Sequence, residues 1–203
     1  MTKAIVFDIG GVLVGLDLGR CIHAFQEILG YDRITSLLDP YHQKGIYGDM
    51  EGGLISADDF HRLVLAESRP GCTPADVDRC MGALITGMAP DTVRTVKELA
   101  KRYPLYLLSN NNPIAMGIIN GMFRDNGIEP STTFKSQFLS YEMRLLKPSQ
   151  AIYQATIKGI GLPAEEILFI DDNETNVLAA REAGMQARLY IPGTPLSALL
   201  SDC

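Results

Sequence analysis

The feature that most constrains this chain is a short apolar run near its start, Ile5 to Phe7, which ends on the carboxylate of Asp8. Three consecutive apolar residues are typical of a strand buried on both faces, as in a parallel sheet. Open parallel sheets bind ligands at the carboxyl ends of their strands, so we expect Asp8 at a binding crevice. Gly10 and Gly11 follow directly and let backbone approach whatever Asp8 contacts. A plain turn at the end of a strand is the alternative, and the rest of the chain decides between the two.

The composition is that of an ordinary globular protein. The chain has 203 residues, of which 46% are hydrophobic and 21% charged, enough for one large domain or for a core with a smaller insert. It carries 18 basic and 24 acidic residues, and the net charge of −6 argues against a nucleic acid or an anionic membrane as the main partner. No apolar run approaches the ~20 residues of a membrane span.

The cysteines and the N-terminus favour a reduced, cytoplasmic protein. The cysteines have no paired spacing and histidines are few, so we expect neither a zinc site nor a disulfide framework. The cysteines are Cys21, Cys72, Cys80 and Cys203. The first residues lead straight into the expected strand, so we expect no secretory signal.

The first part of the chain after that strand has the pattern of a helical insert. Residues 14–88 read as almost wholly helical, with helix starts at Ser56 and Thr73. Glycines at residues 10–15 and 87–90 are typical of hinges. We therefore expect a small helical cap inserted after the first strand.

The rest of the chain alternates between strand and helix patterns. The further strands are expected at residues 104–108, 133–139, 166–170 and 186–191. Strands separated by helices imply right-handed crossovers and a parallel sheet flanked by helices. We predict an α/β core of residues 1–14 and 89–203, with the cap formed by residues 15–88.

Polar residues follow the ends of three expected strands and one loop. They are Asp8, then Ser109 with Asn110, then Lys147, then Asp171 with Asp172. Each of them alone could be a helix cap or a surface turn. However, all carboxyl ends of a parallel sheet open on one side, so we expect these side chains to converge on one crevice.

The residue types at this crevice are complementary. Crowded carboxylates repel one another unless a cation lies among them, and oxygen ligands without sulfur or imidazole favour Mg²⁺. The ammonium of Lys147 and the hydroxyl of Ser109 suit the oxygens of a phosphoryl group. Asp8 can then attack phosphorus and form an aspartyl-phosphate that water cleaves.

The order of these motifs, with a helical insert after the first one, resembles the haloacid dehalogenase superfamily. Within it the motifs look like those of the bacterial glucose-1-phosphatase-like members. The resemblance covers nearly the whole chain and is strongest at residues 7–13, 107–112, 139–148 and 169–185. It implies a Rossmann-like core and a mobile cap that selects the substrate.

The resemblance also implies a role for each site residue. Asp8 would be the nucleophile and a Mg²⁺ ligand, with the Gly10 carbonyl and Asp172 as further ligands. Asp171 would be a ligand or would lie just behind the ligands. The phosphoryl group would be held by Ser109, Asn110 and Lys147, with Lys147 also taking part in catalysis.

The chain departs from the superfamily pattern at Gly10. Superfamily phosphatases usually carry there a second Asp that acts as general acid and base, and such help contributes typically ~10²–10⁴-fold. Either another group substitutes, or the leaving group departs readily, or turnover is slow. Asp17 is one candidate substitute, although a solvated turn suits it better; His23 and His61 read as packing residues, and His42 also lies in the insert. We favour a readily departing group, as in an anomeric sugar phosphate such as glucose 1-phosphate.

The main expectation is therefore a Mg²⁺-dependent phosphatase acting on a small phosphorylated metabolite, and three alternatives stay open. A 2-haloacid dehalogenase would use Asp8 against carbon without metal, which leaves the acidic pair unexplained. A phosphonatase-like hydrolase needs a cap lysine, and Lys44, the only lysine of the insert, lies between Gln43 and Gly45, where we expect a solvated surface position. A phosphate-binding regulatory protein with weak catalysis would explain Gly10. The sequence does not indicate an oligomeric state.

Overall fold

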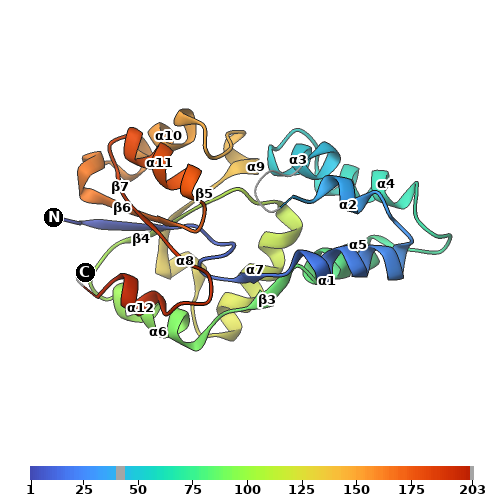
Figure 1. Cartoon of the computed structure of the whole chain (residues 1–203), viewed down its shortest axis with the longest axis horizontal. Coiled ribbons are helices and arrows are strands. Elements are labelled where there is room, and N and C mark those ends of the chain that lie inside the picture. Colours follow the sequence, from blue (N-terminus) through green and yellow to red (C-terminus); the bar gives the residue numbers. More distant parts are fainter. Residues whose placement is uncertain (40–43, 202–203) are drawn as a thin grey trace.

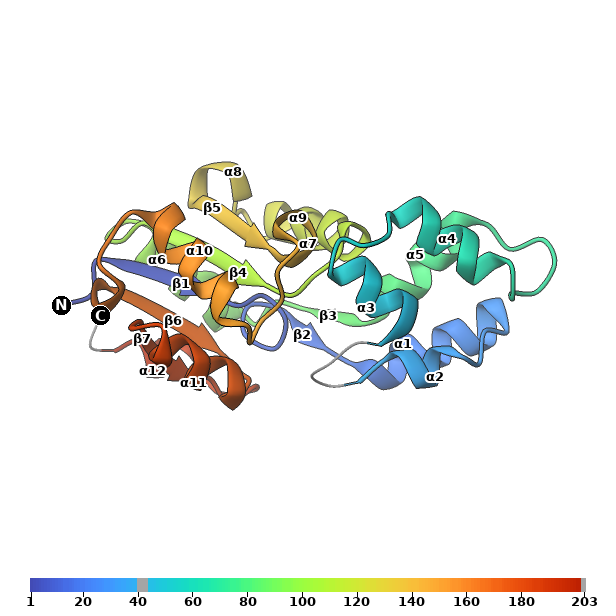
Figure 2. The same ribbon diagram turned by 90° about the horizontal axis from the view of Figure 1, so that it is seen from above.

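The computed structural model describes residues 1–39 and 44–201, so His42 and Cys203 lie outside the described residues. A sheet with its helices occupies one end of the elongated molecule and a group of helices occupies the other (Figures 1 and 2). We keep core and cap as names for the two ranges defined above, a division that remains our proposal. Within the described ranges no helix combines the length and the apolar character needed to cross a bilayer.

The core contains a five-stranded sheet in the order β5-β4-β1-β6-β7, with all neighbouring strands parallel. Its strands are β1 (Ala4–Phe7), β4 (Leu105–Ser109), β5 (Phe134–Leu139), β6 (Ile167–Asp171) and β7 (Gln186–Leu189). Strand β1 lies in the centre, between β4 and β6. The predicted α/β fold with a parallel sheet is therefore confirmed.

Helices cover both faces of this sheet. They are α6 (Pro90–Leu99), α7 (Pro113–Asp125), α8 (Pro130–Thr133), α9 (Ser140–Met143), α10 (Gln150–Ile160), α11 (Glu174–Glu182) and α12 (Leu196–Leu199), with a 3-10 turn at Ala164–Glu166. Buried side chains of α6, α7 and α12 join one apolar cluster, and those of α10 and α11 join another. Helices α8, α9 and α12 are too short for a periodic pattern, and the sequence did not predict them.

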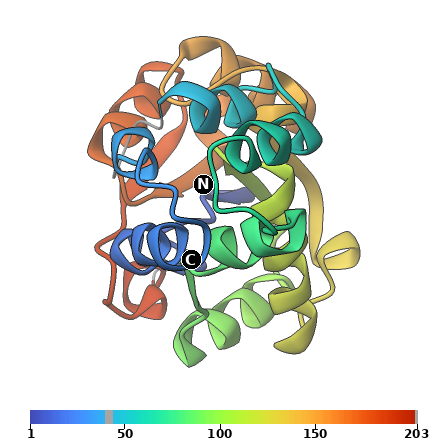
Figure 3. The same cartoon turned by 90° about the vertical axis from the view of Figure 1, so that its right-hand side faces the viewer.

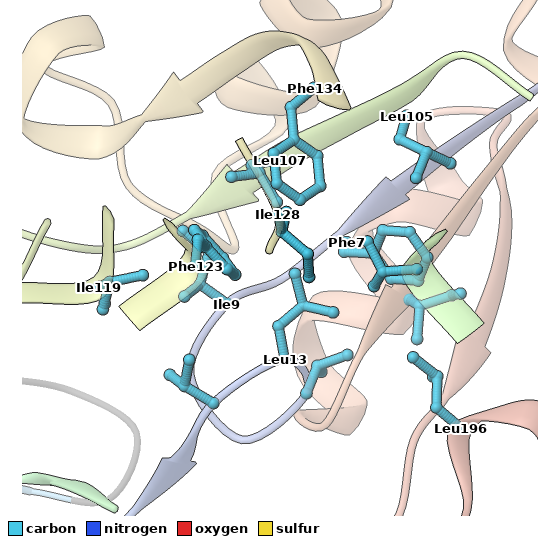
Figure 4. Close-up of a cluster of buried hydrophobic side chains, with 14 of the residues drawn as sticks. Phe7, Ile9, Leu13, Leu105, Leu107, Ile119, Phe123, Ile128, Phe134 and Leu196 are labelled. Carbon is cyan, nitrogen blue, oxygen red and sulfur yellow. The ribbon is translucent and has the colours of Figure 1, made fainter. Parts of the chain in front are cut away.

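The alternation of side chains along β1 explains its unbroken apolar run. Ile5 and Phe7 point into the cluster with α6 and α7, where Phe7 lies among the side chains drawn in Figure 4. Ala4 and Val6 point to the opposite face and pack with α10 and α11. Because each side chain of β1 enters one core or the other, no position on this strand tolerates a polar residue before Asp8.

The cap is a group of helices around a second apolar cluster, to which Ile114 of the core helix α7 also belongs. Its helices are α1 (Leu18–Ala24), continued by a π-helical turn (Phe25–Leu29), α2 (Ile34–Leu37), α3 (Gly45–Glu51), α4 (Ala57–Leu65) and α5 (Pro74–Gly82). The helix starts predicted at Ser56 and Thr73 are confirmed, since each residue forms a capping box with the Asp three positions later. Figure 3 looks from the cap end, so that the cap helices stand in front of the sheet.

One expectation for the cap was wrong. The segment that enters it and the segment that leaves it are not helical, because β2 (Gly15–Leu16) and β3 (Ile85–Gly87) pair as an antiparallel ribbon. Strands of two and three residues leave no period-2 pattern in the sequence. Their pairing partner lies some 70 residues away along the chain, beyond the reach of a local sequence pattern.

The cap meets the core where α5 contacts α7 and where α3 contacts α9 (Figure 1). The hydroxyl of Ser140 donates a hydrogen bond of 2.7 Å to the carbonyl oxygen of Glu51, the last residue of α3. Gly53 follows with φ of +67°, and a Cβ there would lie 2.2 Å from the carbonyl oxygen of Tyr141. This closeness of backbone to backbone requires glycine.

We therefore predict that Gly53→Ala loosens the docking of the cap. Gly71→Ala is the matched control, because Gly71 also has a positive φ, of +88°, but nothing lies within 4 Å of its Cβ position. Both variants should lose about 1 kcal/mol of unfolding free energy through the left-handed backbone. Gly53→Ala should lose a further ~1–3 kcal/mol because Tyr141 must move. Urea titration of the two variants measures the difference, and equal losses would contradict the contact.

Candidate active site

The site is built on three neighbouring strands. Asp8 follows β1, Ser109 ends β4 and Asp171 ends β6, and the order β4-β1-β6 places these ends side by side. The backbone N–H of Asp8 continues the sheet by donating to the carbonyl of Ile170 at 2.8 Å. One carboxylate oxygen of Asp8 accepts from the N–H of Ile9 at 2.7 Å, which fixes the side chain at the edge of the sheet.

Lys147 is buried between two of the carboxylates. Its ammonium nitrogen lies 2.6 Å from Oδ2 of Asp171 and 3.0 Å from Oδ2 of Asp8. It also lies 5.5 Å from the centre of the Phe169 ring. Burial alone would lower the pKa of Lys147, but the charges of Asp171 and Asp8 outweigh burial and raise the pKa above its usual range. Lys147 is therefore a fixed positive charge in the site.

The amide of Asn110 holds Lys147 in place. Its Oδ1 accepts from the backbone N–H of Lys147 at 2.8 Å, and its Nδ2 donates to the carbonyl of the same residue at 3.0 Å. Both ends of the amide are thus used to tie the Lys147 loop to the end of β4. The sequence predicted that Asn110 holds a phosphoryl group, and this stays a prediction; Asn110 lines the cavity, and its main chain could bind a ligand while its side chain holds Lys147.

Asp171 is fully buried, and donors surround its carboxylate. Oδ1 accepts from the N–H of Asn173 at 2.8 Å and from Nδ2 of Asn176 at 3.0 Å. Oδ2 accepts from Lys147 at 2.6 Å and from Nδ2 of Asn176 at 3.1 Å. A carboxylate has about four acceptor sites, and here all are taken. The geometry therefore makes Asp171 an anchor for Lys147.

Asp172 presents its carboxylate beside the glycine pair of the first motif. A Cβ on Gly11 would lie 2.1 Å from Oδ2 of Asp172, and Gly11 has φ of +77°, so only glycine fits. One carboxylate oxygen from each of Asp8, Asp171 and Asp172 lies within 4.8 Å of the others. A set of oxygen donors this close together fits a hard divalent cation such as Mg²⁺.

The carboxylates facing the cavity are destabilised as anions. Burial raises the pKa of Asp8 to about 7; attraction to Lys147 opposes this effect, while Asp171 and Asp172 add to it. Burial also raises the pKa of Asp172, with repulsion from Asp171 as the next cause. A divalent cation would remove this repulsion, so the site is suited to bind one.

A cavity of about 210 Å³ lies between these groups and the cap. Of the residues predicted from the sequence, Asp8, Gly10, Ser109, Asn110, Lys147 and Asp172 line it, while Asp171 lies behind Lys147. Among the residues that the structure describes, the Ser109 hydroxyl has only a long contact of 3.4 Å, to the carbonyl of Asn110, and so can hydrogen-bond to a ligand. Apolar walls come from both regions, including Leu16 and Ile119.

The cap contributes a residue that the sequence reading missed. Glu51, at the end of α3, lines the cavity together with Tyr47 one turn earlier. Burial raises the pKa of Glu51 to about 8, and repulsion from Asp8 adds to the effect while Lys147 opposes it. A sequence signal existed, because an acidic residue in the last turn of a helix opposes the helix dipole and needs another reason to be there.

The other residues weighed from the sequence lie away from the cavity. Asp17 caps α1 by accepting from the N–H of Arg20 at 2.9 Å, in keeping with its interpretation as a turn carboxylate. His61 pairs with Asp78 at 2.7 Å within the cap. Lys44 is exposed and does not line the cavity.

Comparisons with known proteins agree with this geometry. A family model described as haloacid dehalogenase-like hydrolase matches residues 2–184. The chain is 31% identical to D-ribitol-5-phosphate phosphatase from Bacteroides thetaiotaomicron, over 92% of this chain and 90% of the relative.

Two solved structures are similar over nearly their whole length. One is an enzyme of the haloacid dehalogenase (HAD) family from Bacteroides thetaiotaomicron, crystallised with magnesium and inorganic phosphate. It superposes with a TM-score of 0.90 at 28% identity, and the match covers 98% of this chain and 99% of that one. A HAD-like hydrolase from Porphyromonas gingivalis has a TM-score of 0.89 at 28% identity and covers 100% and 97%.

We predict that Lys147→Met destabilises the metal-free protein by about 3–5 kcal/mol, because two buried carboxylates lose their cation. Lys3→Met is the control, since it removes only the exposed ion pair with Glu166 and should cost less than about 1 kcal/mol. Without Lys147 the raised pKa of Asp8 would rise further, so the loss should grow as pH rises from 5 to 8. Urea titrations at both pH values test this, and a loss independent of pH would contradict it.

Proposed function

Because this chain belongs to the haloacid dehalogenase-like hydrolases, we propose that it is a Mg²⁺-dependent phosphatase that hydrolyses a small phosphorylated metabolite through an aspartyl-phosphate. One observation carries this proposal: the carboxylates of Asp8 and Asp172 and the ammonium of Lys147 face one cavity at the carboxyl edge of the sheet. The phosphatase among the relatives, and the neighbour crystallised with magnesium and phosphate, support it.

We propose that Asp8, Asp172 and the carbonyl of Gly10 hold the Mg²⁺ ion. The ion would neutralise the charge between an anionic nucleophile and an anionic substrate. Asp171 was expected as a ligand or as a residue behind the ligands, and its four hydrogen bonds favour the second role. In that role it orients Lys147 toward the cavity.

The remaining chemistry follows from the side chains themselves. A carboxylate oxygen of Asp8 attacks phosphorus, the bond from phosphorus to the leaving oxygen breaks, and Asp8 carries the phosphoryl group. Lys147 and the Ser109 hydroxyl hold the phosphoryl oxygens during transfer. Water then attacks phosphorus and releases phosphate, which restores the Asp8 carboxylate.

The substrate that we propose is a phosphate ester of a small sugar or polyol. A cavity of about 210 Å³, closed by the cap, suits a short carbon chain with one phosphate. The relative's substrate, D-ribitol 5-phosphate, belongs to this class, and glucose 1-phosphate is another member.

The alternative functions explain fewer of the observed contacts. A dehalogenase acting without metal gives no task to Asp172, which faces the cavity beside Gly11. A phosphonatase needs a cap lysine at the substrate, and Lys44 lies exposed outside the cavity. A purely phosphate-binding protein would not need a carboxylate held at the strand end against the position of phosphorus.

The test is phosphate release from a panel of sugar and polyol phosphates with Mg²⁺. We expect turnover that EDTA abolishes and that Asp8→Asn lowers by more than about 10³-fold, because the nucleophile is lost. Asp17→Asn serves as the control and should keep full activity, since Asp17 only caps α1. Halide release from 2-haloacids without Mg²⁺, or no turnover of any phosphate ester, would refute the proposal.

Mg²⁺ binding should release a proton below neutral pH. With the pKa of Asp8 near 7 in the metal-free protein, this carboxyl is mostly protonated at pH 6 and must lose its proton to bind the ion. We expect the affinity for Mg²⁺ to fall by up to about tenfold per pH unit below 7 and to level off above pH 8. Calorimetry in buffers of different ionisation enthalpy counts the protons, and no release at pH 6 would contradict the prediction.

A further inference from the structure

The proposed reaction needs a general acid and base, and the first motif, at residues 7–13, supplies no side chain for this role. Gly10 has no side chain, and the Asp17 carboxylate, considered as a substitute, is used as a helix cap. A poor leaving group such as an alkoxide needs a proton as it departs, and the attacking water needs a base. The proposed reaction therefore needs another acid in the cavity lining.

Glu51 is the acidic residue that the cap adds to this lining. Its side chain has no hydrogen bond or ion pair among the described residues, unlike Asp8 and Asp171. The residue is half-buried and contributes to the cavity wall on the side of the cap. A carboxyl on this wall can give a proton to a group bound in the cavity and can later take one back.

The backbone around Glu51 is fixed to the core. The Ser140 hydroxyl donates to the carbonyl of Glu51 at 2.7 Å and also accepts from the N–H of Asn111, beside the end of β4, at 3.0 Å. Tyr47, one turn before Glu51, lines the same cavity as Asn112 of the loop after β4. The end of α3 is therefore held against the same loop that carries Ser109 and Asn110, so Glu51 has a fixed place in the site.

The direction of attack by Asp8 also favours Glu51 as the proton donor. In phosphoryl transfer the nucleophile and the leaving oxygen lie roughly in line on opposite sides of phosphorus. Asp8 approaches from the end of β1 in the core, so the leaving oxygen faces the opposite wall of the cavity. That wall is the cap, where α3 presents Glu51.

We propose that Glu51 is the general acid and base of this phosphatase, in place of the side chain that Gly10 lacks. As the bond from phosphorus to the leaving oxygen breaks, the Glu51 carboxyl gives its proton to that oxygen and the alcohol departs. In the second step the Glu51 carboxylate takes a proton from the attacking water, whose oxygen bonds to phosphorus as the Asp8–phosphorus bond breaks. Glu51 is then protonated again, and Asp8 is a free carboxylate.

This inference rests on the proposed function, and leaving-group dependence tests it. Glu51→Gln should lower kcat/KM by about 10²–10⁴-fold on glycerol phosphate, whose alkoxide needs a proton. On 4-nitrophenyl phosphate, whose leaving group needs little help, the rate of the first step should fall by less than about tenfold. Asp49→Asn is the matched control, with the same change of carboxyl to amide on α3 but outside the cavity lining, and should change neither rate.

A second readout reports on the hydrolytic step. With 4-nitrophenyl phosphate, Glu51→Gln should form the aspartyl-phosphate and hydrolyse it slowly, because the water lacks its base. We expect a burst of nitrophenol and, after acid quenching, an intact mass raised by one phosphoryl group. Neither wild type nor Asp49→Asn should accumulate this species. The burst also shows that the variant is folded.

The outcomes separate the two proposals. Equal losses on both substrates, or a change confined to KM without phosphoenzyme accumulation, would overturn the role of Glu51 and make it a substrate contact. Wild-type turnover with an unaffected Glu51→Gln variant would do the same while leaving the phosphatase proposal intact. A wild-type protein that releases phosphate from neither ester would instead overturn the proposed function.

Discussion

The buried ion pairs of Lys147 with Asp8 and Asp171 are the interaction on which the rest of the site depends. Three acidic residues at two adjacent strand ends would repel one another in a buried place, and the ammonium offsets this repulsion without metal. Much of the surrounding structure serves to hold that ammonium. The Asn110 amide grips the backbone of Lys147, and Asn176 fills the remaining acceptor sites of Asp171. The fold thus holds the Lys147 ammonium in place and leaves room for a divalent cation.

Much of this arrangement could be predicted from the sequence because the carboxyl ends of neighbouring strands lie side by side in a parallel sheet. Apolar runs that stop at Asp8, at Ser109 and at Asp171 indicate both the strands and the edge on which their polar ends meet. Lys147 was harder to place from local pattern, since it lies in a loop before α10. The order of the motifs, compared with a known superfamily, is what pointed to its position in the pocket.

Apart from the short helices α8, α9 and α12, the features that the sequence did not predict depend on contacts between distant parts of the chain. The pairing of β2 with β3 joins segments that are too short to show a pattern. The place of Glu51 depends on a hydrogen bond to Ser140, 89 positions later, and on the close approach of Gly53 to Tyr141. The local periodicity of a sequence shows which face of a helix is apolar. It does not show which residues of the core a cap helix contacts.

An acid on the cap would make proton transfer depend on whether the cap is docked on the core. An acid in the first motif would be present whether or not the cap is docked, whereas Glu51 reaches the cavity only when α3 rests on α9. In the proposed mechanism the proton donor and the wall that excludes bulk water therefore arrive together. The contacts that hold α3 use the backbone of Glu51 and Gly53 and leave the carboxyl free. Cap docking and proton transfer are then coupled through one residue, whose main chain binds the core while its side chain serves the substrate.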